Sequence, residues 1–237
     1  MKSKKDIFFL ILMLFFLVGI VYFSHQKNMV RVIDNVKISF THSPRFLDTI
    51  LVDKLLTQNF RGKSVQFKDS LDLNMLEKQL NQINEIQNAE LFVLPKGQLS
   101  VSITERIPTF KINSVPSFYA DASGVTFPFV KFEYIQLPIF KTDTIDASII
   151  NVAILIERLK IDTFMKSELK TLYLDGASYH LKLKSYPFEI VLGNENALNE
   201  KIEKLKVFCA FQNIQDSLMN YQKINLTYTN QVVATTL

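Results

Sequence analysis

Residues 7–23 form one unbroken apolar run, and this run constrains the chain more than any other feature of its sequence. Lys2, Lys4 and Lys5 stand immediately before it. At about 1.5 Å of rise per residue, a helix over the run is roughly 25 Å long, which is near the lower limit for crossing a bilayer. We therefore predict a single transmembrane helix at residues 7–23, preceded by a short tail at residues 1–6.

A cleaved secretory signal is the alternative interpretation, because such signals have a similar basic start and apolar middle. The residues after Phe23 read Ser-His-Gln-Lys-Asn and lack the small-x-small pattern of a cleavage site. Lys27 and Arg31 follow the run and partly balance the lysines before it. We predict an uncleaved anchor with its N-terminus in the cytoplasm, because a short tail stays inside more easily than a large folded part does.

Charge and residue types argue against several classes of function. Three lysines and one aspartate in residues 1–6 supply +2 of the formal net charge of +4. Elsewhere acidic and basic residues are interspersed, which argues against a nucleic-acid partner. His25, His42 and His180 lack metal-ligand spacing, and the six glycines form no phosphate-binding loop. We expect no metal, no cofactor, no small-molecule substrate and no enzymatic activity.

The first part of the folded region has the pattern of a small α+β module. Val36, Ile38 and Phe40 alternate as in a half-buried strand, and Asp72 precedes a run with helical apolar spacing. Two helices that follow one strand cover one face of a three-stranded sheet. The predicted order is a strand at residues 30–40, helices at 43–62 and 73–83, and a hairpin of strands at 89–93 and 99–103.

The second part is predicted to be mostly strands. Asp121 and Gly124 favour a turn between two short strands, at residues 118–120 and 125–127. Apolar spacing predicts two helices, and the single cysteine, Cys209, lies on the apolar stripe of the second, as a packed core thiol does. The predicted elements are an antiparallel meander at residues 169–174, 179–184 and 188–192, helices at 149–159 and 197–211, and a closing hairpin at 223–237.

This order resembles the bacterial cell-division family FtsQ/DivIB, and the resemblance covers nearly the whole chain. The segment Thr104-Glu105-Arg106-Ile107-Pro108 has the family's T-E-R-x-P type pattern at the end of the last strand of its POTRA domain. Without the resemblance, Glu105 and Arg106 would read as solvated strand ends and Pro108 as a stop. The family's later features correspond to Asp121 to Gly124, Leu137-Pro138 and Val191-Leu192-Gly193. Many relatives have a glycine after Leu-Pro, whereas Phe140-Lys141-Thr142 stands here, which leaves the loop after Ile139 open.

The resemblance implies an α+β fold with three parts. These are the transmembrane helix at residues 7–23, a POTRA domain of order β-α-α-β-β at residues 30–107, and an FtsQ-type β domain at residues 108–237. The β domain is expected to be mostly antiparallel, with two helices, and to end in an edge strand.

The resemblance also implies a partner-binding site at that edge. In this family a short terminal strand accepts a strand from an FtsB-like protein, which is paired with an FtsL-like protein, and main-chain hydrogen bonds supply the affinity. The alternative from the residues alone is that Val232 and Val233 belong to a final core strand. The positions that correspond to the interface are Tyr228, Gln231, Val232, Val233, Ala234 and Thr235.

The expected function is therefore a non-catalytic scaffold of the division machinery. It would hold its partners at the septum from the inner membrane, with the folded part in the periplasm, and link early division proteins to septal peptidoglycan synthesis. The alternative is a membrane-tethered POTRA adaptor of another envelope assembly or protein-transport complex. The second domain discriminates between them, because transport relatives continue into a large barrel and the residues available here are too few.

Overall fold

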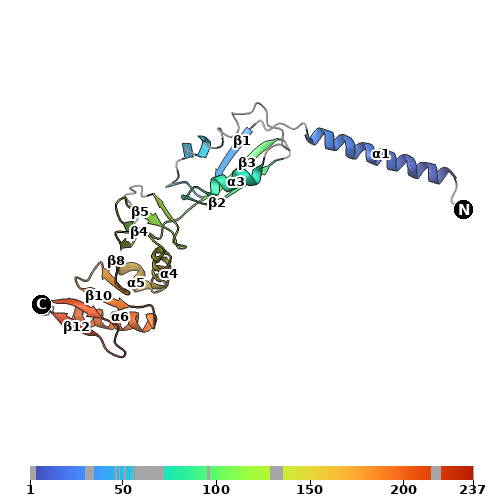
Figure 1. Ribbon diagram of the computed structural model, residues 1–237. Coiled ribbons are helices and arrows are strands. Elements are labelled where there is room, and N and C mark those ends of the chain that lie inside the picture. The colour runs from blue at the N-terminus through green and yellow to red at the C-terminus, as the bar shows by residue number, and fades with distance from the viewer. Residues whose placement is uncertain are drawn as a thin grey trace. The chain divides into compact units, whose positions relative to one another are not determined.

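The computed structural model describes residues 4–29, 35–45, 47, 49–50, 52–54, 56, 72–94, 97–128, 136–214 and 220–236 (Figure 1). The chain divides into two compact units, Met1–Arg106 and Ile107–Leu237. Helix α1 (Lys4–Met29) includes the stretch Ile7–Gln26, which is long and apolar enough to cross a membrane by length and composition. The prediction of an N-terminal apolar helix is therefore confirmed.

The first unit contains a three-stranded sheet of order β1-β3-β2. Strand β3 lies in the centre, parallel to β1 and antiparallel to β2. Helix α3 packs on this sheet through Leu76 and Leu80, which share a core with Leu99, Val101 and Ile103 of β3. The bounds are β1 (Asn35–Phe40), α3 (Leu73–Asn81), β2 (Ile86–Val93) and β3 (Gln98–Glu105).

The structure confirms the second predicted helix of this unit and part of the first. Asp72 caps α3 as expected, because its Oδ1 accepts a hydrogen bond from the Met75 amide at 2.9 Å. In the other predicted helix, residues 49–50, 52–54 and 56 are helical, and Val52 and Leu56 are buried in the same core. Residues 43–45 and 47 are described and are not helical, so the predicted start of that helix at residue 43 is wrong. Its residues 46, 48, 51, 55 and 57–62, the start of the first predicted strand at residues 30–34, and turn residues 95–96 lie outside the described residues.

Glu105 and Arg106 hold the first unit together, so their interpretation as solvated strand ends is wrong. The Glu105 carboxylate accepts hydrogen bonds from the amides of Arg45, at 2.8 Å, and Leu47. These amides stand just before the helical residues that begin at 49. The Arg106 guanidinium donates to the carbonyls of Asn84 and Ile86 at 2.8 and 3.0 Å. The two side chains therefore join the end of β3 to two separate loops.

Replacing Glu105 by Ala is expected to destabilise the first unit by about 1–2 kcal/mol, because two backbone amides lose their acceptor. Hydrogen exchange measured by mass spectrometry should accelerate at the amides of Arg45 and Leu47. Glu90→Ala, a substitution at an exposed position of β2, is the matched control and should change stability by less than about 0.5 kcal/mol. Equal losses in the two variants would contradict the capping role.

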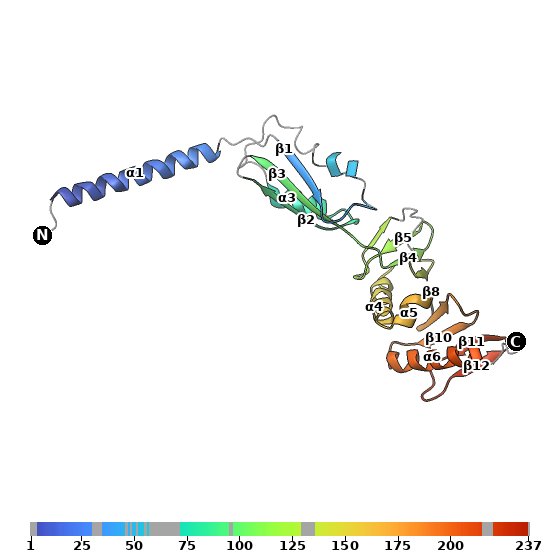
Figure 2. The same cartoon turned by 180° about the vertical axis from the view of Figure 1, so that it is seen from behind.

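The second unit is built on a nine-stranded sheet of order β12-β11-β10-β9-β8-β7-β4-β5-β6 (Figure 2). In the described part of this unit, three helices accompany the sheet. The elements are β4 (Phe110–Asn113), β5 (Phe118–Ala120), β6 (Thr126–Pro128), β7 (Ile139–Lys141), α4 (Ser148–Ile161), α5 (Thr163–Glu168), β8 (Leu169–Asp175), β9 (Ser178–Leu183), β10 (Glu189–Gly193), α6 (Leu198–Ile214), β11 (Tyr221–Asn225) and β12 (Val233–Thr236).

The structure confirms part of the predicted order and corrects the rest. Strands β8, β9 and β10 form the antiparallel meander, and Gly124 takes a φ of +81° in the turn between β5 and β6. Three pairs are parallel, however: β4 with β7, β7 with β8, and β10 with β11. A third helix, α5, was missed, because Asp162 ends α4 in an extended conformation and immediately caps a new helix. Ile139–Lys141 form strand β7, so the chain at the start of the segment after Leu137-Pro138 is a strand rather than a loop.

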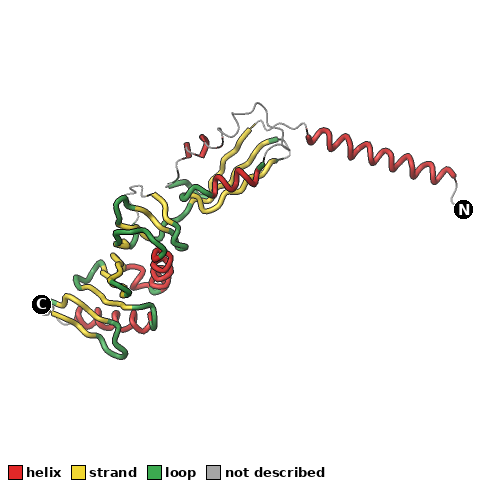
Figure 3. The backbone as a smooth tube through the Cα atoms, viewed as in Figure 1, coloured by secondary structure: helices red, strands yellow, loops and turns green. Residues whose placement is uncertain are grey.

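The register gives the two faces of this sheet opposite characters. One row of paired residues runs from β5 to β12 and is apolar throughout, and its buried members share one core with residues of α4, α5 and α6. Figure 3 shows these helices beside the strands of the second unit. Because neighbouring residues in a strand point to opposite sides, the flanking rows lie on the other face. The apolar row comprises Phe118, Ile112, Phe140, Leu172, Leu181, Ile190, Ile224 and Ala234.

Candidate functional site

Strand β12 forms one edge of the nine-stranded sheet, as its terminal place in the strand order requires. It pairs antiparallel with β11 through Thr235, Ala234 and Val233, opposite Lys223, Ile224 and Asn225. The hairpin of β11 and β12 is joined to β10 by three parallel residue pairs and by a hydrogen bond from the Leu226 amide to the Val191 carbonyl, at 3.0 Å. The expected site thus lies on a short ribbon at the sheet edge.

The six predicted interface residues fall into two groups. Val233 is 39% exposed, Thr235 and Gln231 are exposed, and Tyr228 is 47% exposed. Val232 and Ala234 instead pack against the core on the side of the helices. Tyr228 does not lie on a strand, because β11 ends at Asn225 and a turn containing Asn230, with a φ of +61°, follows. The side chains of the first group are therefore the most available for contact at this edge.

Helix α6 fixes the segment that carries Tyr228. The Lys204 ammonium donates to the carbonyls of Leu226 and Tyr228, at 3.3 and 2.7 Å. Asn225 Oδ1 accepts from the amide and the hydroxyl of Thr227, at 2.9 and 2.7 Å. These bonds satisfy backbone groups in the connection between the two strands, so the edge is presented by an ordered ribbon.

A row of contacting aromatic rings packs against the start of β11. The Phe188 ring lies 5.5 Å from that of Tyr186 and 5.6 Å from that of Phe208, measured between centroids. The Phe208 ring lies 5.3 Å from the ring of Tyr221, the first residue of β11, in an edge-to-face arrangement. Phe188 is fully buried. This row of rings connects the start of β10, helix α6 and the start of β11.

Glu189 of β10 contacts side chains of β8, β9 and β11 on the face of the sheet opposite to the helices. Its carboxylate lies 2.7 Å from His180 Nδ1 and 3.4 Å from Lys223 Nζ, and it accepts from the Tyr173 hydroxyl. Burial raises the pKa of Glu189, but the hydrogen bonds from His180 and Tyr173 outweigh it, so the pKa lies below its ordinary value. Burial, followed by the neighbouring Glu189, raises the pKa of Tyr173 to about 12. The ion pair between Glu189 and Lys223 joins β10 to β11, in addition to the backbone hydrogen bonds between these strands.

Cys209 has the structural role expected from its place on the apolar stripe. Its side chain is 1% exposed within the core beneath α6. Burial raises the pKa of the Cys209 thiol to about 11, which keeps it protonated at neutral pH. Among the residues that the structure describes, no group of three or more His, Cys, Asp or Glu side chains is placed to hold a metal ion.

The comparison with known families assigns the second unit. Residues 107–235, more than half of the chain, match the family described as FtsQ/DivIB, C-terminal related. The chain belongs to the FtsQ/DivIB family, a non-catalytic family of cell-division proteins. With the N-terminal apolar helix, this match indicates a membrane-anchored division protein. No curated protein matches the chain.

Sequence reasoning found the edge but missed the residues that hold it. Lys204 is one of several lysines on α6, and nothing in its spacing shows that it reaches the carbonyls of Leu226 and Tyr228. Glu189, His180 and Lys223 come together only through the register of β9, β10 and β11. The parallel pairing of β10 with β11 was not predicted, so that cluster had no sequence signal.

Proposed function

We propose that this protein is a membrane-anchored, non-catalytic scaffold of the bacterial division machinery that binds its partner by strand addition at β12. The partner is an FtsB-like protein paired with an FtsL-like protein. The observation that carries the proposal is the place of β12 at the end of the sheet order, combined with the family match over the same unit. A strand at an edge has one side of its backbone available for an added strand.

The composition of the two sheet edges favours β12 as the accepting one. Strand β6, at the other edge, contains Pro128, which has no amide hydrogen to donate. Strand β12 reads Val-Ala-Thr-Thr and has neither proline nor charge, the two devices that usually protect an exposed edge. Val233 and Thr235 point to the face without helix packing, so both can contact side chains next to an added strand.

The rest of the chain fits the same role. We infer that the first unit is a POTRA domain, since its elements follow the expected order, and that α1 spans the inner membrane with the folded units in the periplasm at the septum. Division proteins at that place link early components to septal wall synthesis. The alternative of an adaptor in another envelope complex would rest on the first unit alone, whereas the family match lies in the second.

The test is co-purification of the full chain with the FtsB-like and FtsL-like partners from the same genome. The double variant Tyr228→Ala, Val233→Lys removes an exposed ring and puts a charge on the β12 surface. We expect at least about a tenfold loss of captured partner, the scale of one lost hot-spot contact.

Val125→Lys is the matched control, because Val125 is 36% exposed and lies beside the opposite edge. It should capture as much partner as the unaltered protein. Full capture by the double variant, or equal loss in the control, would refute strand addition at β12.

A further inference from the structure

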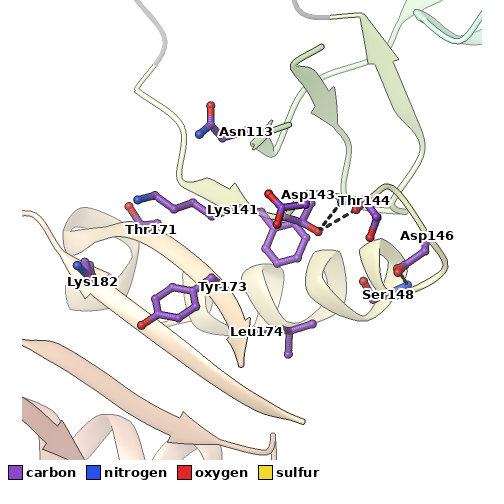
Figure 4. A pocket seen from close by; sticks show the side chains of 12 residues that line it. Asn113, Lys141, Asp143, Thr144, Asp146, Ser148, Thr171, Tyr173, Leu174 and Lys182 are labelled. Carbon is purple, nitrogen blue, oxygen red and sulfur yellow. Dashed lines mark hydrogen bonds between the residues drawn. The ribbon is translucent and has the colours of Figure 1, made fainter. Parts of the chain in front are cut away.

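A depression of about 820 Å³ opens on the second unit (Figure 4). Its floor carries Lys141, Thr171, Tyr173 and Lys182, from strands β7, β8 and β9. The loop from β7 to α4 borders it with Asp143 and other polar residues, as Figure 4 shows. Three strand spacings of about 4.8 Å separate β9, the strand of the floor nearest to the edge, from β12, so the depression is roughly 14 Å from the proposed partner edge.

The depression lies where parallel strands usually present ligand-binding groups. Strands β4, β7 and β8 are parallel neighbours, and Asn113, Lys141 and Tyr173 are paired near their carboxyl ends. Ser148, the first residue of α4, also lines the depression. In open sheets, ligands bind outside the carboxyl ends of parallel strands, because loops and helix starts converge there.

Two lysines and one hydroxyl on the floor lack partners among the residues that the structure describes. Neither Lys141 nor Lys182 forms an ion pair with another residue in the described part of the chain. Thr171 is only 5% exposed, and its hydroxyl has no hydrogen-bond partner among the described residues. Lys182 is paired with Thr171 across the β8–β9 register, so these groups are adjacent. A threonine hydroxyl that opens into the depression, with two lysines on neighbouring strands, suits a carboxylate that accepts hydrogen bonds from all three.

The border of the depression has the opposite charge. Asp143 is exposed there, and Asp146 accepts a hydrogen bond from the Ser148 amide at 2.8 Å. The Ser148 hydroxyl, together with that amide, keeps the pKa of Asp146 below its ordinary value, so the carboxylate stays ionised. A ligand that fills the depression therefore meets cations on the floor and anions at the border.

We propose that this depression binds a short zwitterionic peptide, with its carboxylates on Lys141, Lys182 and Thr171 and an amino group beside Asp143. The stem peptides of peptidoglycan have this chemistry. We choose stem peptides as the ligand because the proposed function places the second unit beside the cell wall, so this choice rests on the proposed function. The site itself is independent of the β12 edge.

Isothermal titration calorimetry of the full chain in detergent micelles tests the proposal. The probe is L-alanyl-γ-D-glutamyl-L-lysine with free termini, which carries two carboxylates and two amino groups. We expect saturable binding to the unaltered protein. The double variant Lys141→Gln, Lys182→Gln should bind at least about tenfold more weakly. Thr171→Val should bind about three- to tenfold more weakly, because it loses about one hydrogen bond to the peptide. Lys166→Gln, Lys170→Gln removes two lysines outside the depression and should leave binding unchanged.

A blocked peptide and a partner-capture assay complete the test. The same peptide, acetylated on its amino groups and amidated on its carboxylates, should not bind, and equal binding of it would overturn the proposal. Absence of saturable binding to the unaltered protein, or an equal loss in the Lys166, Lys170 variant, would overturn it too. Partner capture by the Lys141, Lys182 variant should stay at the level of the unaltered protein. If capture fails in that variant, the lysines belong to the partner site and the separate peptide site is refuted.

Discussion

Phe188→Ala should destabilise the second unit by about 3–5 kcal/mol, the range for removing a fully buried aromatic side chain. Phe188 lies between Tyr186 and Phe208, and Phe208 contacts Tyr221. The cavity therefore forms where α6, β10 and β11 meet. Urea unfolding followed by circular dichroism measures the loss, and hydrogen exchange by mass spectrometry assigns it to the second unit.

The same variant should also lose partner capture, although Phe188 is fully buried and cannot contact a partner. The reason is structural. The hairpin of β11 and β12 is held by its short parallel pairing with β10, by the ion pair between Glu189 and Lys223, and by packing against the core that α6 covers. Phe211→Ala is the matched control on α6, since Phe211 is 45% exposed, and it should change stability by less than about 0.5 kcal/mol. Loss of capture without loss of stability would instead place Phe188 in the interface and contradict its supporting role.

Local patterns in the sequence were sufficient for elements whose residues lie close together along the chain. The cap of α3 at Asp72 and the turn at Gly124 between β5 and β6 were predictable, because each residue acts on the backbone within a few residues of itself. The meander at residues 169–192 followed for the same reason, since short turns join antiparallel neighbours.

Pairings between distant segments could not be predicted in this way. Strand β7 lies between β4 and β8, and the register that assembles the lysine-lined depression depends on these parallel neighbours. Parallel strands need a crossover, so their pairing leaves no signature in a short window of sequence. The same holds for Glu105, whose carboxylate reaches amides about sixty residues earlier in the chain.

The edge residues illustrate both cases. Alternation in the last segment predicted a terminal strand, and the structure has one at Val233–Thr236. Alternation also extended the preceding strand to Tyr228, but Asn225 bonds to Thr227 and ends that strand three residues earlier. A side chain that bonds to its own backbone competes with a strand ladder, and apolar periodicity does not report that competition.

Deletion of residues 7–23 should release the chain from the membrane. The segment holds fourteen Leu, Ile, Phe and Val residues, each of which favours insertion by about 0.3–0.6 kcal/mol at a helix centre. The sum is about 4–8 kcal/mol as an upper estimate, since the residues near the two ends of the helix contribute less. Carbonate washing of isolated membranes, followed by immunoblotting, measures where the protein remains.

Two further variants test whether apolar content alone holds this segment in the membrane. Leu14→Arg, Phe15→Arg puts two charges at the helix centre, at a cost of about 2.5–3.5 kcal/mol each, which offsets most of the insertion energy and should also release the protein. A variant with the same residues in shuffled order keeps the composition and should stay in the membrane, because insertion depends on apolar content rather than on a specific contact. An intact mass that includes residues 1–6 is expected for the unaltered protein. Loss of those residues would mean that the segment is a cleaved signal, and retention of the deletion variant after washing would mean that another part of the chain holds the membrane.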